Sequence, residues 1–218
     1  MDARVTRAVF VAGLCLLGFL ALAYGSVALP SVQAIDASID AAVTALRTKP
    51  LLAVFLWITT LGAGATLLAV MLTATGLLWR GADRAFLRPL WLVYMGTEAT
   101  VWGTKFLLGR ERPVFLEIAS ASSPSFPSAH TAGAAAVYGF LAYILVSGAN
   151  RGAPARAPIV AMAAFTIAAV ALSRVVLGVH FFSDVLGGLA VAGLWLCLGA
   201  ILRPEDKRQI ASNFRSGT

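Results

Sequence analysis

The chain carries its most reactive combination of side chains between Ser173 and Asp184, in the sequence SRVVLGVHFFSD. His180 and Asp184 are four residues apart, so on a helix the carboxylate can lie beside the imidazole and fix which ring nitrogen carries the proton. A histidine held in this way can act as a nucleophile or as a general base. Arg174 adds a permanent cation whose planar set of donors suits phosphate oxygens. Because polar side chains beside long apolar runs are costly, this segment predicts a functional site that binds an anion.

A second group of charged residues lies in the sequence KFLLGRERP, which starts at Lys105. Lys105 and Arg112 are two helical turns apart, so we expect them to face the same way before Pro113 ends the helix. Glu98 precedes Lys105 by the same spacing and is expected on the same face, as a buried partner for a cation or hydroxyl in preference to a direct catalytic role. Arg110 is expected to point elsewhere if the helix continues through it.

The third segment is PSAH, from Pro127 to His130, which follows a serine-rich loop at 114–126. Proline suits the first turn of a helix, and a serine such as Ser128 suits its N-terminal cap. The free backbone N–H groups at such a helix start can bind an anion. His130 and His180 are the two histidines of the chain, and both lie in the suspected site segments.

These residue types favour phosphoryl transfer. Lys105, Arg112 and Arg174 supply the positive charge that the oxygens of a transferring phosphoryl group require. Ser128 completes the predicted phosphate-binding set. We find no cluster of carboxylates in the sequence that would serve as ligands for a two-metal mechanism, so no metal ion or cofactor is expected.

The two histidines have different predicted roles in the reaction. His180, oriented by Asp184, is the predicted in-line nucleophile and would form a phosphohistidine. His130 is predicted to protonate the leaving oxygen and then to activate water. An alternative has Ser128 as the nucleophile with a histidine as its base, but it leaves the three cations without a full role.

The composition indicates a membrane protein. Of 218 residues, 59% are hydrophobic and 12% are charged, and the mean hydropathy is +0.84, which excludes an ordinary soluble domain. The net charge of +7 does not indicate nucleic-acid binding, because the basic residues fall between apolar segments and do not form one polar face. Cys15 and Cys197 both lie within apolar runs, so no disulfide framework is expected.

The apolar runs predict an all-α, polytopic membrane protein with a single domain over residues 1–218 and six transmembrane helices. The expected spans are 8–29, 50–79, 89–109, 128–146, 158–177 and 180–202, with an amphipathic interfacial helix at 31–48 and a polar tail at 203–218. The interfacial helix is expected to pack on the bundle as a connector, the alternative being a membrane-surface element at the site entrance. The first run also resembles a signal peptide, but its apolar stretch continues beyond the cleavage-like sequence, which favours a retained helix.

The basic residues predict the orientation. Eleven of the seventeen lie on one side of a six-span arrangement, namely Arg4, Arg7, Arg80, Arg84, Arg88, Arg151, Arg156, Arg203, Lys207, Arg208 and Arg215. By the positive-inside rule this side, with both termini, is cytoplasmic. All three polar segments then lie at the outer face. Short loops and an alanine-rich composition favour a bacterial inner membrane.

The three segments together resemble the signatures of the type 2 phosphatidic acid phosphatase superfamily. The matching patterns are K-x(6)-R-P at Lys105 to Pro113, P-S-x-H at Pro127 to His130, and S-R-x(5)-H-x(3)-D at Ser173 to Asp184. Where the family usually has glycine in the second pattern, this chain has Ala129. The resemblance implies a helical bundle core shared with bacterial acid phosphatases and vanadium haloperoxidases, and a metal-independent site near the outer leaflet.

The resemblance also assigns roles. It implies that His180 is the nucleophile, with Asp184 as its partner and His130 as the general acid. The implied phosphate ligands are Lys105, Arg112, Ser128 and Arg174, while Ser173, Arg110 and Glu98 stay possible accessory residues. The expected substrate is a lipid phosphate or diphosphate: undecaprenyl diphosphate, phosphatidylglycerol phosphate or phosphatidic acid. Two alternatives stay open, a phosphotransferase that uses the same intermediate and a non-catalytic protein that binds or transports a lipid anion. The sequence does not indicate an oligomeric state.

Overall fold

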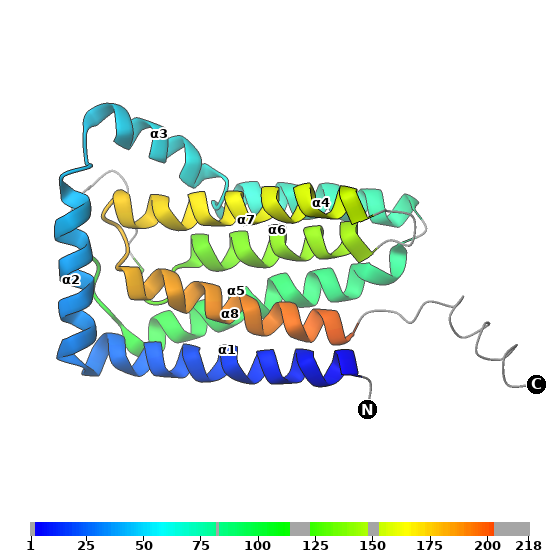
Figure 1. The fold of residues 1–218 in the computed structure, drawn as a ribbon, viewed down its shortest axis with the longest axis horizontal. Coiled ribbons are helices and arrows are strands. Elements are labelled where there is room, and N and C mark those ends of the chain that lie inside the picture. The colour runs from blue at the N-terminus through cyan, green and yellow to red at the C-terminus, as the bar shows by residue number, and fades with distance from the viewer. Residues whose placement is uncertain (1–2, 82, 114–122, 148–152, 203–218) are drawn as a thin grey trace, which may run out of the picture.

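The computed structural model describes residues 3–81, 83–113, 123–147 and 153–202, and within these ranges it contains helices and no strand. The helices are α1 (Ala3–Ala28), α2 (Pro30–Thr44), α3 (Lys49–Thr60), α4 (Gly64–Arg80), the short 3-10 helix η1 (Arg84–Phe86), α5 (Leu87–Leu108), α6 (Ala129–Ser147), α7 (Ala153–Val176) and α8 (Phe182–Ile201). Helices α1 and α4 to α8 run roughly along one axis, and α2 crosses one end of the bundle (Figure 1). The predicted tail at 203–218 and most of the loop at 114–126 lie outside the described residues.

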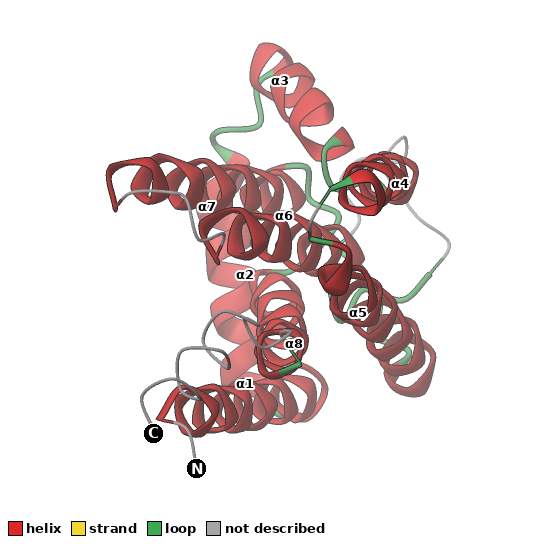
Figure 2. Ribbon diagram, turned by 90° about the vertical axis from the view of Figure 1, so that its right-hand side faces the viewer, coloured by secondary structure: helices red, strands yellow, loops and turns green. Residues whose placement is uncertain are grey.

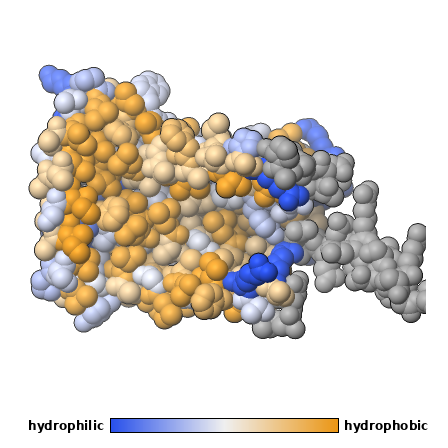
Figure 3. Space-filling view, in the orientation of Figure 1, coloured by the Kyte–Doolittle hydropathy of each residue, from blue (hydrophilic) through white to orange (hydrophobic). Residues whose placement is uncertain are grey.

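The structure agrees with six transmembrane segments. Five segments are long and apolar enough to cross a membrane: 3–28, 49–80, 129–147, 156–176 and 182–201. Helix α5 is not one of these five by its composition, but its 22 residues give a length of about 33 Å, enough for a hydrocarbon core of about 30 Å, so a count of six is approximately consistent with the structure. Apolar side chains cover most of the face seen in Figure 3, and hydrophilic residues gather at its right-hand end, opposite α2.

The second predicted span, 50–79, is interrupted, which corrects the expectation of one continuous helix. Helix α3 ends at Thr60 and α4 begins at Gly64, and α3 leans away from the bundle (Figures 1 and 2). Glycines weaken a helix, and this break brings Gly62 close to α6 and α7. A Cβ at Gly62 would lie 2.6 Å from the Val170 side chain and 3.0 Å from the carbonyl oxygen of His130.

Helix α6 occupies the centre of the bundle, with α4, α5, α7 and α8 around it (Figure 2). Its buried face from Thr131 to Val137 is mostly alanine and glycine, so neighbouring helices can approach closely, as small residues allow in membranes. At Gly188 of α8 an added Cβ would lie only 2.7 Å from the carbonyl oxygen of Ser128. This close packing fixes the start of α6 against the start of α8.

Helix α2 confirms the predicted helix between the first two spans, although it ends at Thr44, four residues early. Pro30 occupies its first turn, where a missing N–H costs nothing. Beyond its end, Arg47 donates hydrogen bonds to the carbonyl oxygens of Val176 at 3.0 Å and Val175 at 3.3 Å. Because these are the last residues of α7, the segment that contains α2 holds the end of α7 in place.

Candidate active site

The structure brings the three predicted segments together at the end of the bundle that α2 crosses. Lys105 lies in the last turn of α5, Ser128 and His130 at the start of α6, and His180 and Asp184 where α7 gives way to α8. The segments touch directly, because the Ser128 N–H donates to the carbonyl oxygen of Asp184 at 3.0 Å. Residues more than fifty positions apart in sequence therefore line one polar region.

His180 lies in a turn and not in a helix, which corrects the predicted start of the last span at residue 180. Helix α7 ends at Val176, Gly178 has a left-handed φ of 62°, and α8 begins at Phe182. The four-residue spacing to Asp184 still forms a pair, with Nδ1 of His180 3.3 Å from Oδ2 of Asp184. The same oxygen accepts the Phe181 N–H at 2.9 Å, so Asp184 both caps α8 and holds the imidazole.

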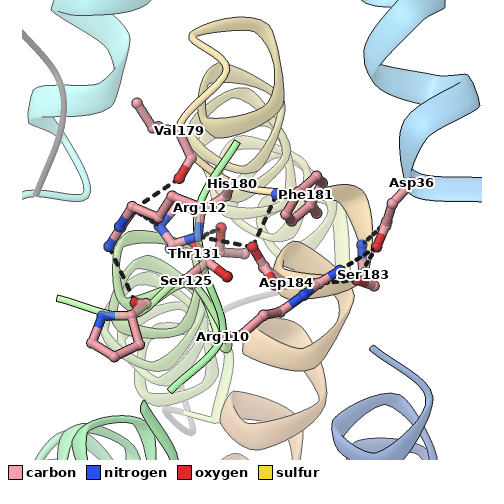
Figure 4. A network of polar contacts seen from close by, with 12 residues as sticks. Asp36, Arg110, Arg112, Ser125, Thr131, Val179, His180, Phe181, Ser183 and Asp184 are labelled. Carbon is pink, nitrogen blue, oxygen red and sulfur yellow. Dashed lines mark hydrogen bonds and ion pairs between the residues drawn. The ribbon is translucent and has the colours of Figure 1, made fainter. Parts of the chain in front are cut away.

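The surroundings of His180 define its tautomer and its charge. A carboxylate beside Nδ1 favours the proton on that nitrogen and leaves Nε2 unprotonated, with a lone pair that accepts a hydrogen bond from Arg112 in this structure. Nε2 lies 3.1 Å from Nη1 of Arg112 (Figure 4). Burial lowers the pKa of His180 well below its usual value, and the cations Arg174, Arg112 and Lys105 lower it further, whereas a hydrogen bond with the Ser125 backbone acts in the opposite direction. The imidazole is therefore held neutral, as a nucleophile requires.

Arg112 is anchored by backbone oxygens on both sides of the site. It donates from Nη1 to the carbonyl oxygen of Val179 at 2.8 Å and from Nε to that of Ser123 at 2.7 Å. Burial also lowers the pKa of Arg112. Its guanidinium spans the gap between the His180 turn and the loop before α6, which leaves it facing the reactive nitrogen.

Lys105 and Arg174 add two further buried cations. Lys105 is 1% exposed and donates to the carbonyl oxygens of Pro124 and of Ser125, the latter at 3.1 Å. Arg174 donates to Thr59 Oγ1 at 2.6 Å, and its Nε finds no partner among the described residues. Within the described ranges no carboxylate forms an ion pair with Lys105, Arg112 or Arg174. Such buried cations favour an anionic ligand, because a buried donor without a partner is costly.

Ser128 and His130 complete the site from α6. Ser128 Oγ accepts from Thr131 Oγ1 at 3.0 Å and from the Thr131 N–H at 3.4 Å, so this serine caps the helix start. Because α6 begins at Ala129, Pro127 lies before the cap and not in the first turn, where the sequence predicted it. Its own N–H is already bonded to Asp184 and is not free for an anion, unlike the expectation from sequence. His130 is half-buried in the first turn of α6, and no hydrogen bond from the described residues fixes its ring.

Two of the possible accessory residues lie apart from this chemistry. The Ser173 hydroxyl donates to the Val170 carbonyl oxygen of its own helix at 2.6 Å. Glu98 accepts the Trp102 indole N–H at 3.1 Å, and one of its oxygens lies close to Gly133 of α6. Both side chains therefore serve contacts within and between helices.

Arg110 also lies at the site, because the helix does not continue through it, which was the condition for the expectation that it points elsewhere. Helix α5 ends at Leu108, with Gly109 in a left-handed conformation at φ 60°, and not at Pro113. After this turn Arg110 forms an ion pair with Asp184 and another with Asp36 of α2, at 2.8 Å. The glycine four residues before the proline was the available signal for the early helix end.

Asp36 is the residue that the sequence did not reveal. A charged residue of an amphipathic helix is expected on its exposed polar face, yet Asp36 is only 2% exposed. Nothing in a single sequence indicates that a carboxylate of an amphipathic helix has a buried arginine partner 74 residues further along the chain.

Comparison with known proteins identifies the family. Residues 86–208, more than half of the chain, match the model of the PAP2 superfamily. The chain belongs to the PAP2 superfamily. Phosphatidylglycerophosphatase B of Bacillus subtilis (strain 168) is 35% identical over 167 residues, which cover 74% of this chain and 79% of that protein.

Solved structures agree with this PAP2 assignment. The crystal structure of a transmembrane PAP2-type phosphatidylglycerolphosphate phosphatase from Bacillus subtilis superposes with a TM-score of 0.79 at 32% identity, and covers 87% of this chain and 94% of that one. The structure of Aquifex aeolicus LpxE, with a TM-score of 0.59 and 22% identity over 74% of this chain and 92% of that one, shares the fold. The chain is therefore a PAP2-type membrane lipid phosphatase.

A cavity of about 520 Å³ opens beside the polar site of this PAP2 phosphatase. Its walls come from the α1–α2 corner, the segment after α5 and the start of α8, and include Ser26, Gln33, Asp36, Arg110, Arg112 and Phe181. Arg112 thus contacts both the cavity and His180. Both polar and apolar groups line this space, as they do in many sites for small ligands.

Proposed function

We propose that this enzyme hydrolyses the phosphomonoester of phosphatidylglycerol phosphate and releases inorganic phosphate. The observation that carries the proposal is the arrangement of His180, with Nδ1 against Asp184 and Nε2 facing Arg112. The similar sequence and the similar solved structure from Bacillus subtilis both carry names that specify this substrate. The cavity beside Arg112 offers room for a glycerol headgroup.

In the first step of the proposed reaction, Lys105, Arg112, Ser128 and Arg174 bind the oxygens of the phosphoryl group. Nε2 of His180 attacks phosphorus in line as the bond to the glycerol oxygen breaks. His130, protonated at this stage, donates a proton to that oxygen, so phosphatidylglycerol leaves as a neutral alcohol. The proton on Nδ1 stays on the imidazole, where the Asp184 carboxylate accepts its hydrogen bond and stabilises the positive charge that the ring acquires.

In the second step, neutral His130 accepts a proton from water, whose oxygen attacks phosphorus. The bond between phosphorus and Nε2 breaks, and inorganic phosphate leaves with His180 neutral again. Within the described residues no group of three His, Cys, Asp or Glu side chains is placed to hold a metal ion. We therefore propose a metal-independent reaction.

We further propose that the site faces the exterior of a bacterial plasma membrane. The basic residues of the N-terminus and of the α4–α5 connection (Arg4, Arg7, Arg80, Arg84 and Arg88) belong to the ends of helices opposite α2 (Figure 1). By the positive-inside rule that end is cytoplasmic. The α2 end, with the active site, then lies at the outer leaflet.

Substrate choice is tested by phosphate release in detergent, with EDTA present, from phosphatidylglycerol phosphate, phosphatidic acid and undecaprenyl diphosphate. We expect kcat/KM for phosphatidylglycerol phosphate to exceed the others by at least about tenfold, which corresponds to about 1.4 kcal/mol of discrimination. A higher rank for undecaprenyl diphosphate would overturn the proposed substrate. Loss of activity in EDTA would overturn metal independence, and phosphate found on an acceptor lipid or sugar would indicate a phosphotransferase.

The role of Arg112 is tested by Arg112→Lys. Lysine keeps the charge but cannot bridge two backbone carbonyls while facing the phosphoryl group. We expect kcat/KM to fall by about 10- to 100-fold, with thermal stability close to that of the wild type. Arg84→Lys, the same change in η1 at the far end of the bundle, is the matched control and should stay within about twofold. Equal effects of the two substitutions would contradict this role.

A further inference from the structure

The buried carboxylate of Asp36 holds the first turn of α8. Its Oδ1 accepts the Ser183 N–H at 2.9 Å, and its Oδ2 accepts the Ser183 hydroxyl at 2.6 Å. These contacts join α2, which crosses the end of the bundle, to the helix that carries Asp184 (Figure 4). Asp36 therefore fixes the backbone immediately next to a proposed catalytic residue.

Arg110 lies between two carboxylates. Its Nη2 donates to Asp36 Oδ2 at 2.8 Å, and its Nη1 donates to Asp184 Oδ1 and to Ser183 Oγ, the latter at 2.8 Å. The guanidinium also lies 4.3 Å from the centre of the Phe181 ring, a favourable cation–π distance. With 8% of its side chain exposed, Arg110 is held by these contacts while one side of it lines the cavity.

The two oxygens of Asp184 face in different directions. Oδ1 receives Arg110, while Oδ2 receives the Phe181 N–H and lies against Nδ1 of His180. The rotation of this carboxylate therefore depends on Arg110, and the position of Arg110 depends on Asp36. A continuous series of charge-assisted contacts connects α2 to the imidazole.

We propose that Asp36 and Arg110 are positioning residues for the lipid phosphatase reaction, which act through Asp184 to hold His180 with Nε2 toward phosphorus. This inference rests on the proposed function of His180. None of the three sequence patterns that identify the site assigns either residue a role. Asp36 balances the charge of Arg110, so that Arg110 supports Asp184 without pulling its carboxylate away from the imidazole.

Removal of either residue has a distinct physical consequence. Without the charge of Asp36, Arg110 has Asp184 as its one remaining carboxylate and would bind it more closely, which weakens the contact with Nδ1. Without Arg110, two buried carboxylates face each other with no cation between them, so one of them would tend to take up a proton. Either change loosens the ring and lowers the population that can attack in line.

The first test is Asp36→Asn, which preserves the shape of the side chain. We expect kcat to fall by about 10- to 100-fold, the usual range for an outer partner of a reactive group, while KM stays within about twofold. Asp40→Asn is the matched control, because Asp40 lies one turn further along α2 and pairs with Arg47, which keeps its bonds to α7. A changed KM with normal kcat, or an equal loss in both variants, would overturn the proposal.

A double-mutant cycle then tests whether the two residues act together. If Asp36 acts through Arg110, adding Asp36→Asn to an Arg110→Met protein should lower kcat by less than about a further twofold. If the two residues act independently, the losses in kcat of the two single variants multiply. Multiplied losses would overturn the proposal. The cycle needs only residual activity of the Arg110→Met protein.

A spectroscopic readout separates positioning from general damage. The chain has two histidines, so ¹⁵N-histidine labelling gives two rings, and a His130→Gln sample assigns them. We expect Asp36→Asn, but not Asp40→Asn, to shift the His180 nitrogen signals. Unchanged His180 signals would overturn the proposal. Full activity of a His180→Gln protein would instead overturn the proposed function, so the two failures are distinguishable.

Discussion

Replacement of His180 by glutamine is expected to lower kcat for phosphatidylglycerol phosphate by at least about 10⁴-fold, the scale seen when a nucleophile is removed. Glutamine is similar in size and keeps polar atoms near Asp184 and Arg112, but it offers no nitrogen lone pair to attack phosphorus. Because Lys105, Arg112 and Arg174 stay in place, substrate binding should survive. The measurement is phosphate release under single-turnover and steady-state conditions.

The control for this variant is its ability to bind an anion. Protection against thermal unfolding by inorganic phosphate should match that of the wild type within about threefold in the apparent Kd, since the cations are intact. A His180→Gln protein that is folded, binds phosphate and retains more than about 1% of kcat would show that another group attacks phosphorus. Ser128 would then be the first candidate, because its hydroxyl lies at the start of α6.

Replacement of His130 by glutamine is expected to lower kcat for the lipid substrate by about 10²- to 10⁴-fold, the usual contribution of a general acid and base. The effect should depend on the leaving group. p-Nitrophenyl phosphate releases a stable phenolate that needs no proton, so its first step should be almost normal in the variant. The second step still lacks its base, so phosphoenzyme should accumulate.

Rapid-mixing kinetics test this directly. The His130→Gln protein should release a burst of nitrophenol equal to the enzyme concentration, followed by slow turnover, whereas the wild type should show a smaller burst or none. Equal losses on both substrates without a burst would contradict a role in leaving-group protonation. Tyr138→Phe, a change two turns along α6 whose hydroxyl bonds the Leu61 carbonyl, is a suitable control on the same helix.

The spacing of polar residues predicted most of the site residues, because it indicates which helix ends these residues occupy. Lys105, Ser128 and Arg174 each lie in the first or last turn of a long apolar helix or just outside it, and the number of spans places those ends on one side. The resemblance to a known family added roles to residues that were already selected by type and position. The structure then supplies the distances that join them.

Local backbone geometry was less predictable. The interval from His180 to Asp184 is compatible with a helix, but Gly178 ends α7 and leaves the histidine in a turn, where a cap contact forms the same pair. Likewise, the sequence indicates only that Gly62 is small enough for close helix packing. The interruption of the second span at this glycine depends on how closely α6 and α7 approach it. Tertiary packing decides such points, and a single sequence does not contain it.

The least predictable part is the contribution of α2. An amphipathic pattern gives the helix but not what its polar face contacts. Asp36 is buried because the chain changes direction at Gly109 and brings Arg110 against it. This change of direction requires α5 to end at Leu108. A long-range ion pair of this kind becomes visible only when both helix ends are placed.

The most direct test of the central claim is to trap the covalent intermediate. Enzyme mixed with ³²P-labelled phosphatidylglycerol phosphate is quenched in alkali, in which phosphohistidine is stable and acyl phosphates are not, and the labelled peptide is identified by mass spectrometry. We expect the label on His180, absent from His180→Gln and increased in His130→Gln. A label on Ser128, or turnover with no labelled protein in the His130→Gln enzyme, would contradict a phosphohistidine mechanism.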